Sequence, residues 1–365
     1  MHVTNGCSPR IDLYVSNEFN ADPKNLMISA ALGVFRIEVM KKYNLEEFDL
    51  SQGYLFFWDK FEKSNWFLEC MIDLRGRDVT DGVEHISDGG QWDMFINLAE
   101  RYGVVPKSMD GLIVTKLHDH AVTTRKTTAF GHSVDQLRQE KDKALKEIYN
   151  ITAINLGEPL KKPFTWAFHN KDKKYRNIAI ALRGARWLHC KMHLRCMTGR
   201  FSIAETVSII TDPHNKTMEL YTVQCLGHTS GGRLIRYANA PVDGLKSLAI
   251  QKLRSSKPVW FGADMGNFKM NKAERLLHGD SLMTHAMVFT SVHLDENDKP
   301  IHWRVENSWG DMGGDKGCLA TSDARFSELV CQFVLGKKIV HQKFLEVLER
   351  DVHVLLAYDP MGALA

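Results

Sequence analysis

The chain changes character just past the middle of its 365 residues. The first part carries apolar residues at helical spacing. The second part holds six short runs of β-branched and aromatic residues, each bounded by Gly, Pro, Asn or Asp. Helices followed by strands indicate an α+β architecture, with a helical half packed on an antiparallel β half. The six runs predicted as strands are 206–211, 219–225, 258–263, 284–293, 301–306 and 328–335.

The predicted helices begin with a strongly apolar segment after Asp22 and Pro23, which suit an N-cap and a first helical turn. This helix has so little polar face that we expect it to be buried. Lys41 and Lys42 suit its C-terminal end, and Asn44 suits the residue that terminates it. Further helices are predicted over 51–70, 91–102 and 133–149, and a last one over about 342–349. We expect one domain over 1–365, with a helical half (about 22–150), a β-rich half (about 205–340) and a C-terminal arm (351–365).

Composition excludes several classes of protein. Apolar residues make up 44% and charged residues 25%, a normal globular balance. The longest run of apolar or small residues, 26–35, is too short to span a bilayer, and no signal peptide follows Met1. The seven cysteines are odd in number and form no CxxC pair, which disfavours a disulfide framework and a zinc ribbon. We therefore expect a cytoplasmic protein with no membrane partner, no cofactor and no metal site.

One segment, 161–200, is strongly basic, with eleven Lys and Arg residues against the single acid Asp172. A solvated surface stretch is the favoured interpretation, and a phosphate-binding face for nucleic acid is the alternative. The same segment contains four residues of metal-ligand type whose spacing fits no standard zinc module. They are His189, Cys190, His193 and Cys196.

A histidine and an asparagine suggest catalytic chemistry. His285 opens a strongly apolar predicted strand, and Asn307 lies at the end of the next one. A hairpin would bring the two side chains together, so that the amide of Asn307 fixes the tautomer and ring plane of the imidazole. The other ring nitrogen would then face a nucleophile. Trp309 would shield the hydrogen bond from water. An isolated histidine is more often a core residue, but this combination with Asn307 favours the catalytic interpretation.

These residues carry a family resemblance. His285 with Asn-Ser-Trp-Gly over 307–310 is similar to the second half of papain-type cysteine peptidases. Several segments resemble the bleomycin hydrolase family of cysteine aminopeptidases, over about 19–110, 145–175 and 205–365. The resemblance implies a papain-like fold, a homohexamer with active sites facing an internal channel, removal of residues from peptide N-termini and hydrolysis of the amide of bleomycin. The matching segments are 41–60, 88–94, 259–262, 270–275, 281–287, 304–310 and 359–365.

The resemblance also implies roles for individual residues. His285 would be general base and acid, and Asn307 would orient it. Gly89 and Gly90 would hold the substrate backbone, since a turn without side chains lets another backbone approach closely. The terminal carboxylate of Ala365 would meet the free ammonium of the peptide substrate, a charge that an internal peptide bond does not offer.

The chain departs from the family at the nucleophile. Family members carry a cysteine at the start of the central helix, where the helix dipole and a histidinium lower its pKa, and an earlier Gln that holds the oxyanion. Residues 29–36 match this helix, but counting back from Arg36 places Leu26 at the cysteine's position. No Gln precedes Gln52. Without a thiolate there is no acyl-enzyme route, so we predict activity at or near background.

Two explanations remain open for the missing nucleophile. The first is a lost segment, natural or from gene prediction; the second is a pseudoenzyme that binds peptides or single-stranded nucleic acid. We favour the lost segment because it explains the missing Cys, the missing Gln and an abrupt junction near 20–26 together. Cys7 is a weak substitute, because Pro9 follows and no helix begins there. We expect core thiols at Cys70, Cys225 and Cys331.

Overall fold

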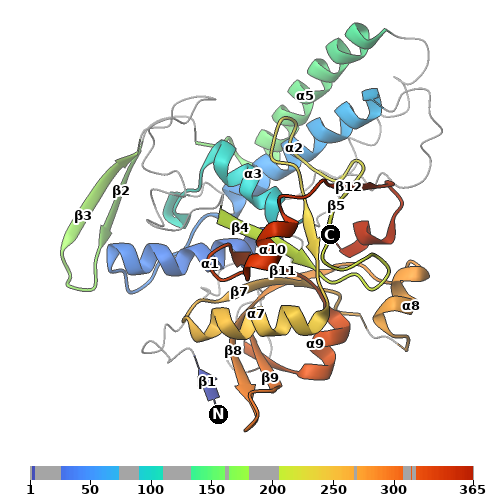
Figure 1. Ribbon diagram of the computed structural model, residues 1–365. Helices are drawn as coiled ribbons and strands as arrows, with labels where there is room; N and C mark the ends of the chain where they lie inside the picture. The colour runs from blue at the N-terminus through green and yellow to red at the C-terminus, as the bar shows by residue number, and fades with distance from the viewer. Residues whose placement is uncertain are drawn as a thin grey trace.

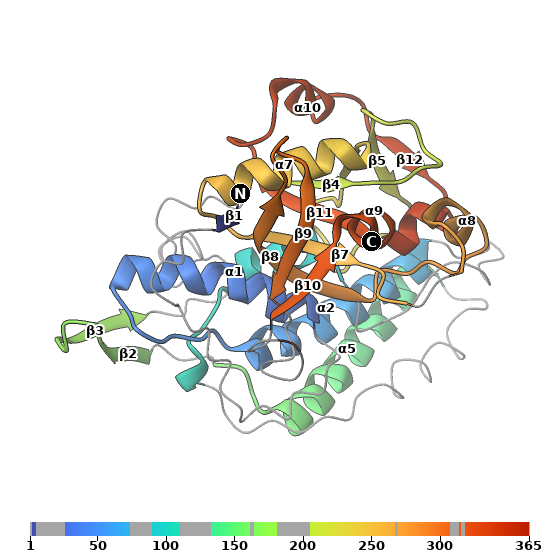
Figure 2. The ribbon, with the colours of Figure 1, turned by 90° about the horizontal axis from the view of Figure 1, so that it is seen from below.

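The computed structural model describes residues 2–4, 26–73, 90–109, 133–160, 164–180, 205–266, 269–306, 314 and 318–364. In Figure 1 the helices α2, α3 and α5 lie on one side of a large sheet, and α7 and α9 lie on the other. Figure 2 shows α1, α2 and α5 grouped together, away from α7. The core therefore lies in two parts, one on each face of the sheet.

The helical half follows the predicted order. Its helices are α1 (Leu26–Tyr43), α2 (Gln52–Asp73), α3 (Trp92–Tyr102) and α5 (Val134–Leu156), with a 3-10 turn η2 (Lys107–Met109) after α3. Lys41 and Lys42 lie in the last turn of α1, as predicted, and Asn44 follows with a left-handed φ of 53°. The helix predicted over 133–149 is confirmed and continues to Leu156, and Ser133 and Gln136 form a capping box at its start.

The sheet contains all six predicted strands and is mixed rather than wholly antiparallel. Strand β4 runs parallel to β6, and β5 runs parallel to β12, whereas the other pairs are antiparallel. The strand order is β10-β9-β8-β7-β11-β4-β6-β5-β12, and β1 pairs with β8. The strands are β1 (His2–Thr4), β4 (Thr206–Ile210), β5 (Leu220–Val223), β6 (Tyr237–Asn239), β7 (Val259–Ala263), β8 (His285–Leu294), β9 (Pro300–Glu306), β10 (Cys318–Ser322), β11 (Val330–Gly336) and β12 (His353–Leu355).

The predicted helix over 342–349 is confirmed as α10 (Gln342–Val347). Other elements were not predicted: the hairpin of β2 (Phe164–His169) and β3 (Tyr175–Ile180), the strands β6, β10 and β12, and several short helices. These helices are α7 (Val242–Arg254), α8 (Lys272–Leu277), α9 (Asp323–Leu329) and the 3-10 helix η4 (Pro360–Leu364).

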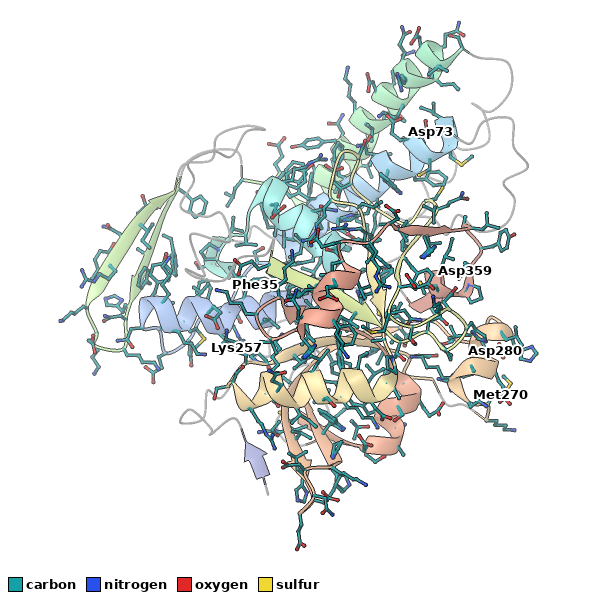
Figure 3. The ribbon with its side chains drawn as sticks, in the orientation of Figure 1. Phe35, Asp73, Lys257, Met270, Asp280 and Asp359 are labelled. Atoms are coloured by element: carbon teal, nitrogen blue, oxygen red, sulfur yellow. The ribbon has the colours of Figure 1, made fainter. Side chains whose placement is uncertain are left out.

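Aromatic side chains fill both parts of the core. On the helical side Phe35 of α1, labelled in Figure 3, stacks on Trp92 and Phe95 of α3, with ring centroids 5.7 and 5.4 Å apart. Trp92 also lies 5.6 Å from Trp260 of β7, which joins α3 to the sheet. The second core, on the side of α7 and α9, packs rings from β7, β8, β9, α9 and β11 together. Its aromatic residues are Phe261, Phe289, Trp303, Phe326 and Phe333.

Strand β11 lies in the middle of the sheet, and buried lysines reach it from two helices. Lys252 of α7 donates from Nζ to the carbonyl of Val334 at 2.9 Å, and burial lowers the pKa of this lysine to about 7. Lys272 of α8 donates to the carbonyl of Val330 at 2.8 Å, and burial lowers its pKa as well. Val330 is the first residue of β11 and Val334 lies two residues before its last, so each helix is bonded to the central strand through a lysine side chain.

Within the described ranges, no helix is long and apolar enough to cross a membrane. Nor do three or more His, Cys, Asp or Glu residues in those ranges form a group that could hold a metal ion. The residues of metal-ligand type in the basic segment, from His189 to Cys196, lie outside the described residues.

Candidate active site

His285 is the first residue of β8 and pairs with Ala263, the last residue of β7. Its Nδ1 lies 3.0 Å from the carbonyl oxygen of Thr284. Because a carbonyl only accepts hydrogen bonds, Nδ1 donates, and Nε2 carries the lone pair of the neutral ring. Burial lowers the pKa of His285, and the bond to Thr284 opposes that shift in part. The imidazole is therefore held neutral and oriented near pH 7, as a general base requires.

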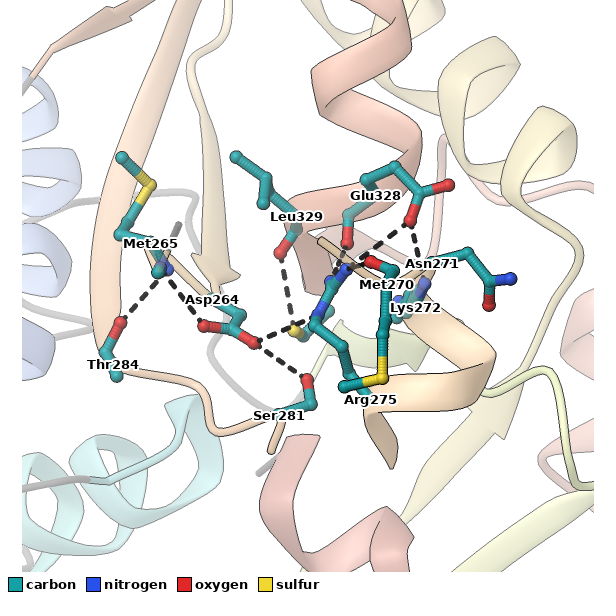
Figure 4. Close-up of polar contacts among 12 residues, drawn as sticks. Asp264, Met265, Met270, Asn271, Lys272, Arg275, Ser281, Thr284, Glu328 and Leu329 are labelled. Carbon is teal, nitrogen blue, oxygen red and sulfur yellow. Dashed lines mark hydrogen bonds and ion pairs between the residues drawn. The ribbon is translucent and has the colours of Figure 1, made fainter. Parts of the chain in front are cut away.

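The segment just before His285 is fixed by a buried polar network around Asp264 (Figure 4). The carboxylate of Asp264 accepts from the hydroxyl of Ser281 at 2.9 Å and lies 3.8 Å from Nε of Arg275. The hydroxyl of Thr284 accepts from the backbone N–H of Met265 at 3.1 Å. Asp264 and Met265 directly follow β7, so the network pins residues 281–284 to the end of that strand. The backbone that carries the ring of His285 is therefore held in a fixed position.

Arg275 is almost fully buried and anchors α8 to the end of α9. It donates to the carbonyl of Glu328 at 2.7 Å and to the carbonyl of Met270 at 2.9 Å. Asn271 and Glu274 form a capping box that starts α8. Cys331 lies in the same region with no exposed surface, and burial raises the pKa of its thiol. A buried, protonated thiol is a poor nucleophile, so Cys331 fits the expected core role.

Gly90 lies against the first turn of α1. A Cβ placed on Gly90 would stand 2.7 Å from Cε of Met27 and 3.6 Å from Sδ of Met94. Gly90, two residues before α3, and the start of the central helix are therefore neighbours. Helix α1 also packs against β7 and β8, the strands that end and begin beside His285.

Arg36 joins α1 to the end of β9. Its Nη1 donates to Asp49 at 2.9 Å, and its Nη2 lies 3.8 Å from the carboxylate of Glu306. Glu306 is the last residue of β9 and lies opposite Val288 of β8. The predicted hairpin of the two strands is thus confirmed, and the chain leaves β9 three residues along β8 from His285. Asn307 is the next residue after Glu306 and lies outside the described residues.

The C-terminal segment is anchored against the sheet near α8. Strand β12 pairs with β5, and Met361 of η4 is fully buried. The 3-10 helix η4 packs on α8, and Figure 1 shows the C-terminus close to that helix. A Cβ on Gly362 would contact Val223 at 3.7 Å. The arm is therefore an ordered part of the fold up to Leu364.

The structure describes only part of the predicted site. His285 and Gly90 lie within the described residues, whereas Gly89, Asn307 and Ala365 lie outside them, as does Cys7. Leu26, which the family resemblance aligns with the expected nucleophile, is the first residue of α1. Four residues that position the site were missed from the sequence, because each acts through a partner far away in the chain. They are Arg36, Asp264, Arg275 and Ser281.

Comparisons with known proteins agree with this geometry. A model of the Peptidase C1-like family matches residues 25–269 and 266–362. Bleomycin hydrolase from Mus musculus is 36% identical over 387 aligned residues, covering 93% of this chain and 84% of that protein. Aminopeptidase C from Streptococcus thermophilus is 36% identical over 383 residues, covering 92% and 83%. The crystal structure of PepW from Lactobacillus rhamnosis, 36% identical, superposes with a TM-score of 0.81 and covers 94% of this chain and 85% of that one. The expected papain-like α+β fold is confirmed.

Proposed function

The chain belongs to the Peptidase C1-like family of cysteine-type aminopeptidases, and we propose that it carries the family's base and peptide-binding site without its nucleophile. The observation that carries the proposal is the position of His285. Its ring is half-buried, its Nδ1 is held by the Thr284 carbonyl, and its pKa is lowered by burial. A histidine in this state can take a proton from a nucleophile at neutral pH.

In this proposal the amide oxygen of Asn307 orients the imidazole of His285 by accepting from Nδ1 together with the Thr284 carbonyl, so that Nε2 is the nitrogen that takes a proton. It directly follows Glu306, which the Arg36 guanidinium holds toward α1. Gly89 and Gly90 receive the backbone of a peptide with a free N-terminus. The packing of Gly90 against Met27 supports the assignment of Gly90, because this residue lies beside the start of the helix. The carboxylate of Ala365 pairs with the substrate's ammonium, and the buried anchor Met361 supports a fixed arm.

The chemistry stops at the first covalent step. A cysteine peptidase transfers a thiol proton to histidine, attacks the amide carbon and forms a thioester that water then hydrolyses. Leu26 stands where that thiol would be, and its side chain has no acidic proton and no lone pair. His285 would therefore have no protein nucleophile to activate at the start of α1.

A fluorogenic aminoacyl-amide assay on the purified chain tests the proposal, with bleomycin as a second substrate because relatives carry the name bleomycin hydrolase. We expect release at the rate of the buffer blank, with no change after treatment with a thiol alkylator. Turnover well above the blank that alkylation abolishes would contradict the proposal and would assign the nucleophile to another cysteine, with Cys7 as the first to test by replacement.

A non-catalytic role in binding single-stranded nucleic acid is the second candidate. Its support is the β2–β3 hairpin, where Lys171, Lys173, Lys174 and Arg176 are exposed around Tyr175, which is 60% exposed. Basic side chains with an exposed aromatic ring can hold phosphates and stack on a base. Salt-dependent retention on single-stranded DNA, lost when Lys173, Lys174 and Arg176 are neutralised together, would support this role. Flow-through at low salt would dismiss it.

We further propose that the protein is cytoplasmic, because its seven cysteines are odd in number and form no CxxC pair. We also propose that it assembles as a homohexamer, as the family resemblance implies. Native mass spectrometry of the purified chain tests the assembly directly. A monomer at micromolar concentration would contradict the hexamer.

A further inference from the structure

Cys70 and Cys225 come from distant parts of the chain and meet in the fold. Cys70 lies in the last turn of α2, one turn before Asp73, which Figure 3 labels at the end of that helix. Cys225 lies two residues beyond β5. Cys225 is among the groups that raise the pKa of Cys70, so the two side chains lie near each other, and both residues are free thiols.

Contacts of Trp66 hold the two cysteines in this arrangement. Trp66 lies four residues before Cys70, so the two side chains share one face of α2. The indole N–H of Trp66 donates to the carbonyl of Cys225 at 3.2 Å. A Cβ on Gly227 would stand 2.8 Å from Cζ2 of the same indole, which shows how tightly the loop backbone packs on the ring. The backbone on both sides of Cys225 is therefore fixed against the face of α2 that carries Cys70.

The rest of this loop, residues 224–233, is anchored to α3. Arg101 donates from Nη2 to the carbonyl of Ser230 at 2.6 Å. Asn97 makes two hydrogen bonds to the backbone of Arg233, one from its amide to the carbonyl at 3.0 Å and one to its oxygen from the N–H at 2.7 Å. The loop thus has fixed points before and after Cys225, which limits how far the thiol can move from Cys70.

The backbone at Cys225 is itself unusual. Its φ is 59°, in the left-handed region that residues with a side chain seldom adopt. Such a conformation persists only where the surrounding contacts impose it, and here those contacts are the Trp66 bond and the anchored loop.

We propose that Cys70 and Cys225 form a disulfide bond when the protein meets hydrogen peroxide. The half-buried Cys225 is the more accessible sulfur and reacts first. Its thiol loses a proton, the thiolate attacks one peroxide oxygen to give a sulfenic acid, and the other oxygen leaves as hydroxide, which takes up that proton and becomes water. The sulfur of Cys70 then attacks the sulfenic sulfur, the S–S bond forms, and the hydroxyl group leaves with the thiol proton as a second water. The two thiols lose two electrons in total, and the peroxide gains them.

The environment of Cys70 supports this order of events. Burial, with help from Cys225, Asp73 and Glu69, raises the pKa of Cys70 to about 12. A protonated thiol with 8% of its surface exposed does not compete for peroxide, but it is adjacent to Cys225 once that sulfur is oxidised. The product is a covalent link between the end of α2 and the loop that follows β5. Since neither residue belongs to the proposed peptide site, this inference stands apart from the proposed function.

Peptide mapping of the full chain tests the proposal. We expect that treatment with equimolar peroxide, followed by digestion without reductant, yields one cross-linked species that joins the peptides of Cys70 and Cys225 and disappears after dithiothreitol. Cys70→Ala and Cys225→Ala should each abolish it, and Cys70→Ala should leave Cys225 as a sulfenic acid that dimedone traps. Cys318→Ala is the matched control, since Cys318 is also half-buried, and the cross-link should persist there.

A thermal melt gives an independent readout. Closing a long chain segment should raise the Tm of the oxidised protein by about 5 °C, and Cys70→Ala should show no such rise. Should Cys70→Ala fail to fold, Cys225→Ala gives the same comparison from the more exposed partner. A dimedone adduct or sulfinic acid at Cys225 in the full chain, or a cross-link to any other cysteine, would overturn the proposal.

Discussion

The guanidinium of Arg36 joins three parts of the chain, with Nη2 3.8 Å from Glu306 of β9 and Nη1 2.9 Å from Asp49. Arg36 lies on the central helix α1, Asp49 lies in the segment before α2, and Glu306 is the residue before Asn307. Burial raises the pKa of Glu306, and the charge of Arg36 opposes that shift. One buried cation therefore fixes the spacing between the central helix and the point where β9 ends.

Arg36→Met should destabilise the protein by about 3 kcal/mol, because it leaves two carboxylates without their buried partner. Urea unfolding followed by circular dichroism measures the change. Arg254→Met is the control, since the ion pair of Arg254 with Asp298 is exposed and should contribute less than about 1 kcal/mol. Equal losses in the two variants would contradict a structural role specific to Arg36.

Stability should fall as the pH drops below about 6.5, and His228 should account for part of the fall. His228 is buried, and burial, with Lys63 and Arg101, holds its pKa well below the usual value. Its carboxylate neighbour Asp59 does not reverse this shift and is already paired with Lys63 at 2.9 Å.

The direction of this change in stability with pH follows from proton binding. Below pH 6.5 the unfolded chain binds a proton at His228 and the folded chain does not, so acid favours unfolding by up to about 1.4 kcal/mol per pH unit. Urea midpoints between pH 5 and 8 measure the slope. His228→Gln should flatten it, whereas His302→Gln, at an exposed histidine, should leave it unchanged. An unchanged slope in His228→Gln would assign the acid sensitivity to other groups.

Two glycine-to-alanine substitutions should change the stability of the protein in opposite directions. A Cβ on Gly262 of β7 would lie 2.0 Å from Sδ of Met283, so Gly262→Ala should force Met283 aside and destabilise by about 1–3 kcal/mol. A Cβ on Gly33 of α1 meets nothing within 4 Å, so Gly33→Ala should stabilise by about 0.5–1 kcal/mol through helix propensity. Thermal melts of both variants decide; a loss of stability in Gly33→Ala would show that the space beside α1 is smaller than described.

Leu26→Cys should create thiol-dependent amidase activity where the parent chain has none. The new thiol would lie at the N-terminus of α1, where the helix dipole favours the thiolate. Without an oxyanion-holding Gln, the rate should stay about 100- to 1,000-fold below that of an enzyme with a complete site. The fluorogenic assay measures the gain.

The matched controls are Leu32→Cys, which places a thiol deeper in the same helix, and Leu26→Cys combined with His285→Ala. Both should remain at the blank rate. Activity that survives the loss of His285 would remove the proposed base from the mechanism, and activity in Leu32→Cys would show that position on α1 does not matter.

The sequence was most informative where one element could be recognised from its own residues. The β8 run and the β9 run are β-branched, apolar and bounded by turn residues, and their hairpin formed as predicted. Helix α7 was missed although Leu245, Leu248, Ala249 and Leu253 have helical spacing and are buried. Strands β6 and β12 have three residues each, too few for a pattern of their own, and their partners β4 and β5 decide their conformation.

The candidate site also contains some residues that could be found from the sequence and others that could not. His285 could be found because an apolar strand and the motif over 307–310 accompany it in the sequence. The polar network that holds its backbone could not, since Asp264 and Ser281 only become partners when β7 and β8 pair. Likewise Cys70 and Cys225 each fit a core thiol from their neighbours in sequence, and their contact depends on how the loop after β5 folds against α2.

Two buried lysines that donate hydrogen bonds to β11 allow local opening at the centre of the sheet to be measured by chemical labelling. An amine-reactive reagent reaches the exposed Lys173 at once, but Lys252 and Lys272 are bonded to the carbonyls of Val334 and Val330 and closed to solvent. Their labelling requires the helix to lift from the strand, so its rate reports local opening of α7 and α8 separately. The relative labelling rates of the two lysines therefore show which of the two helices opens first.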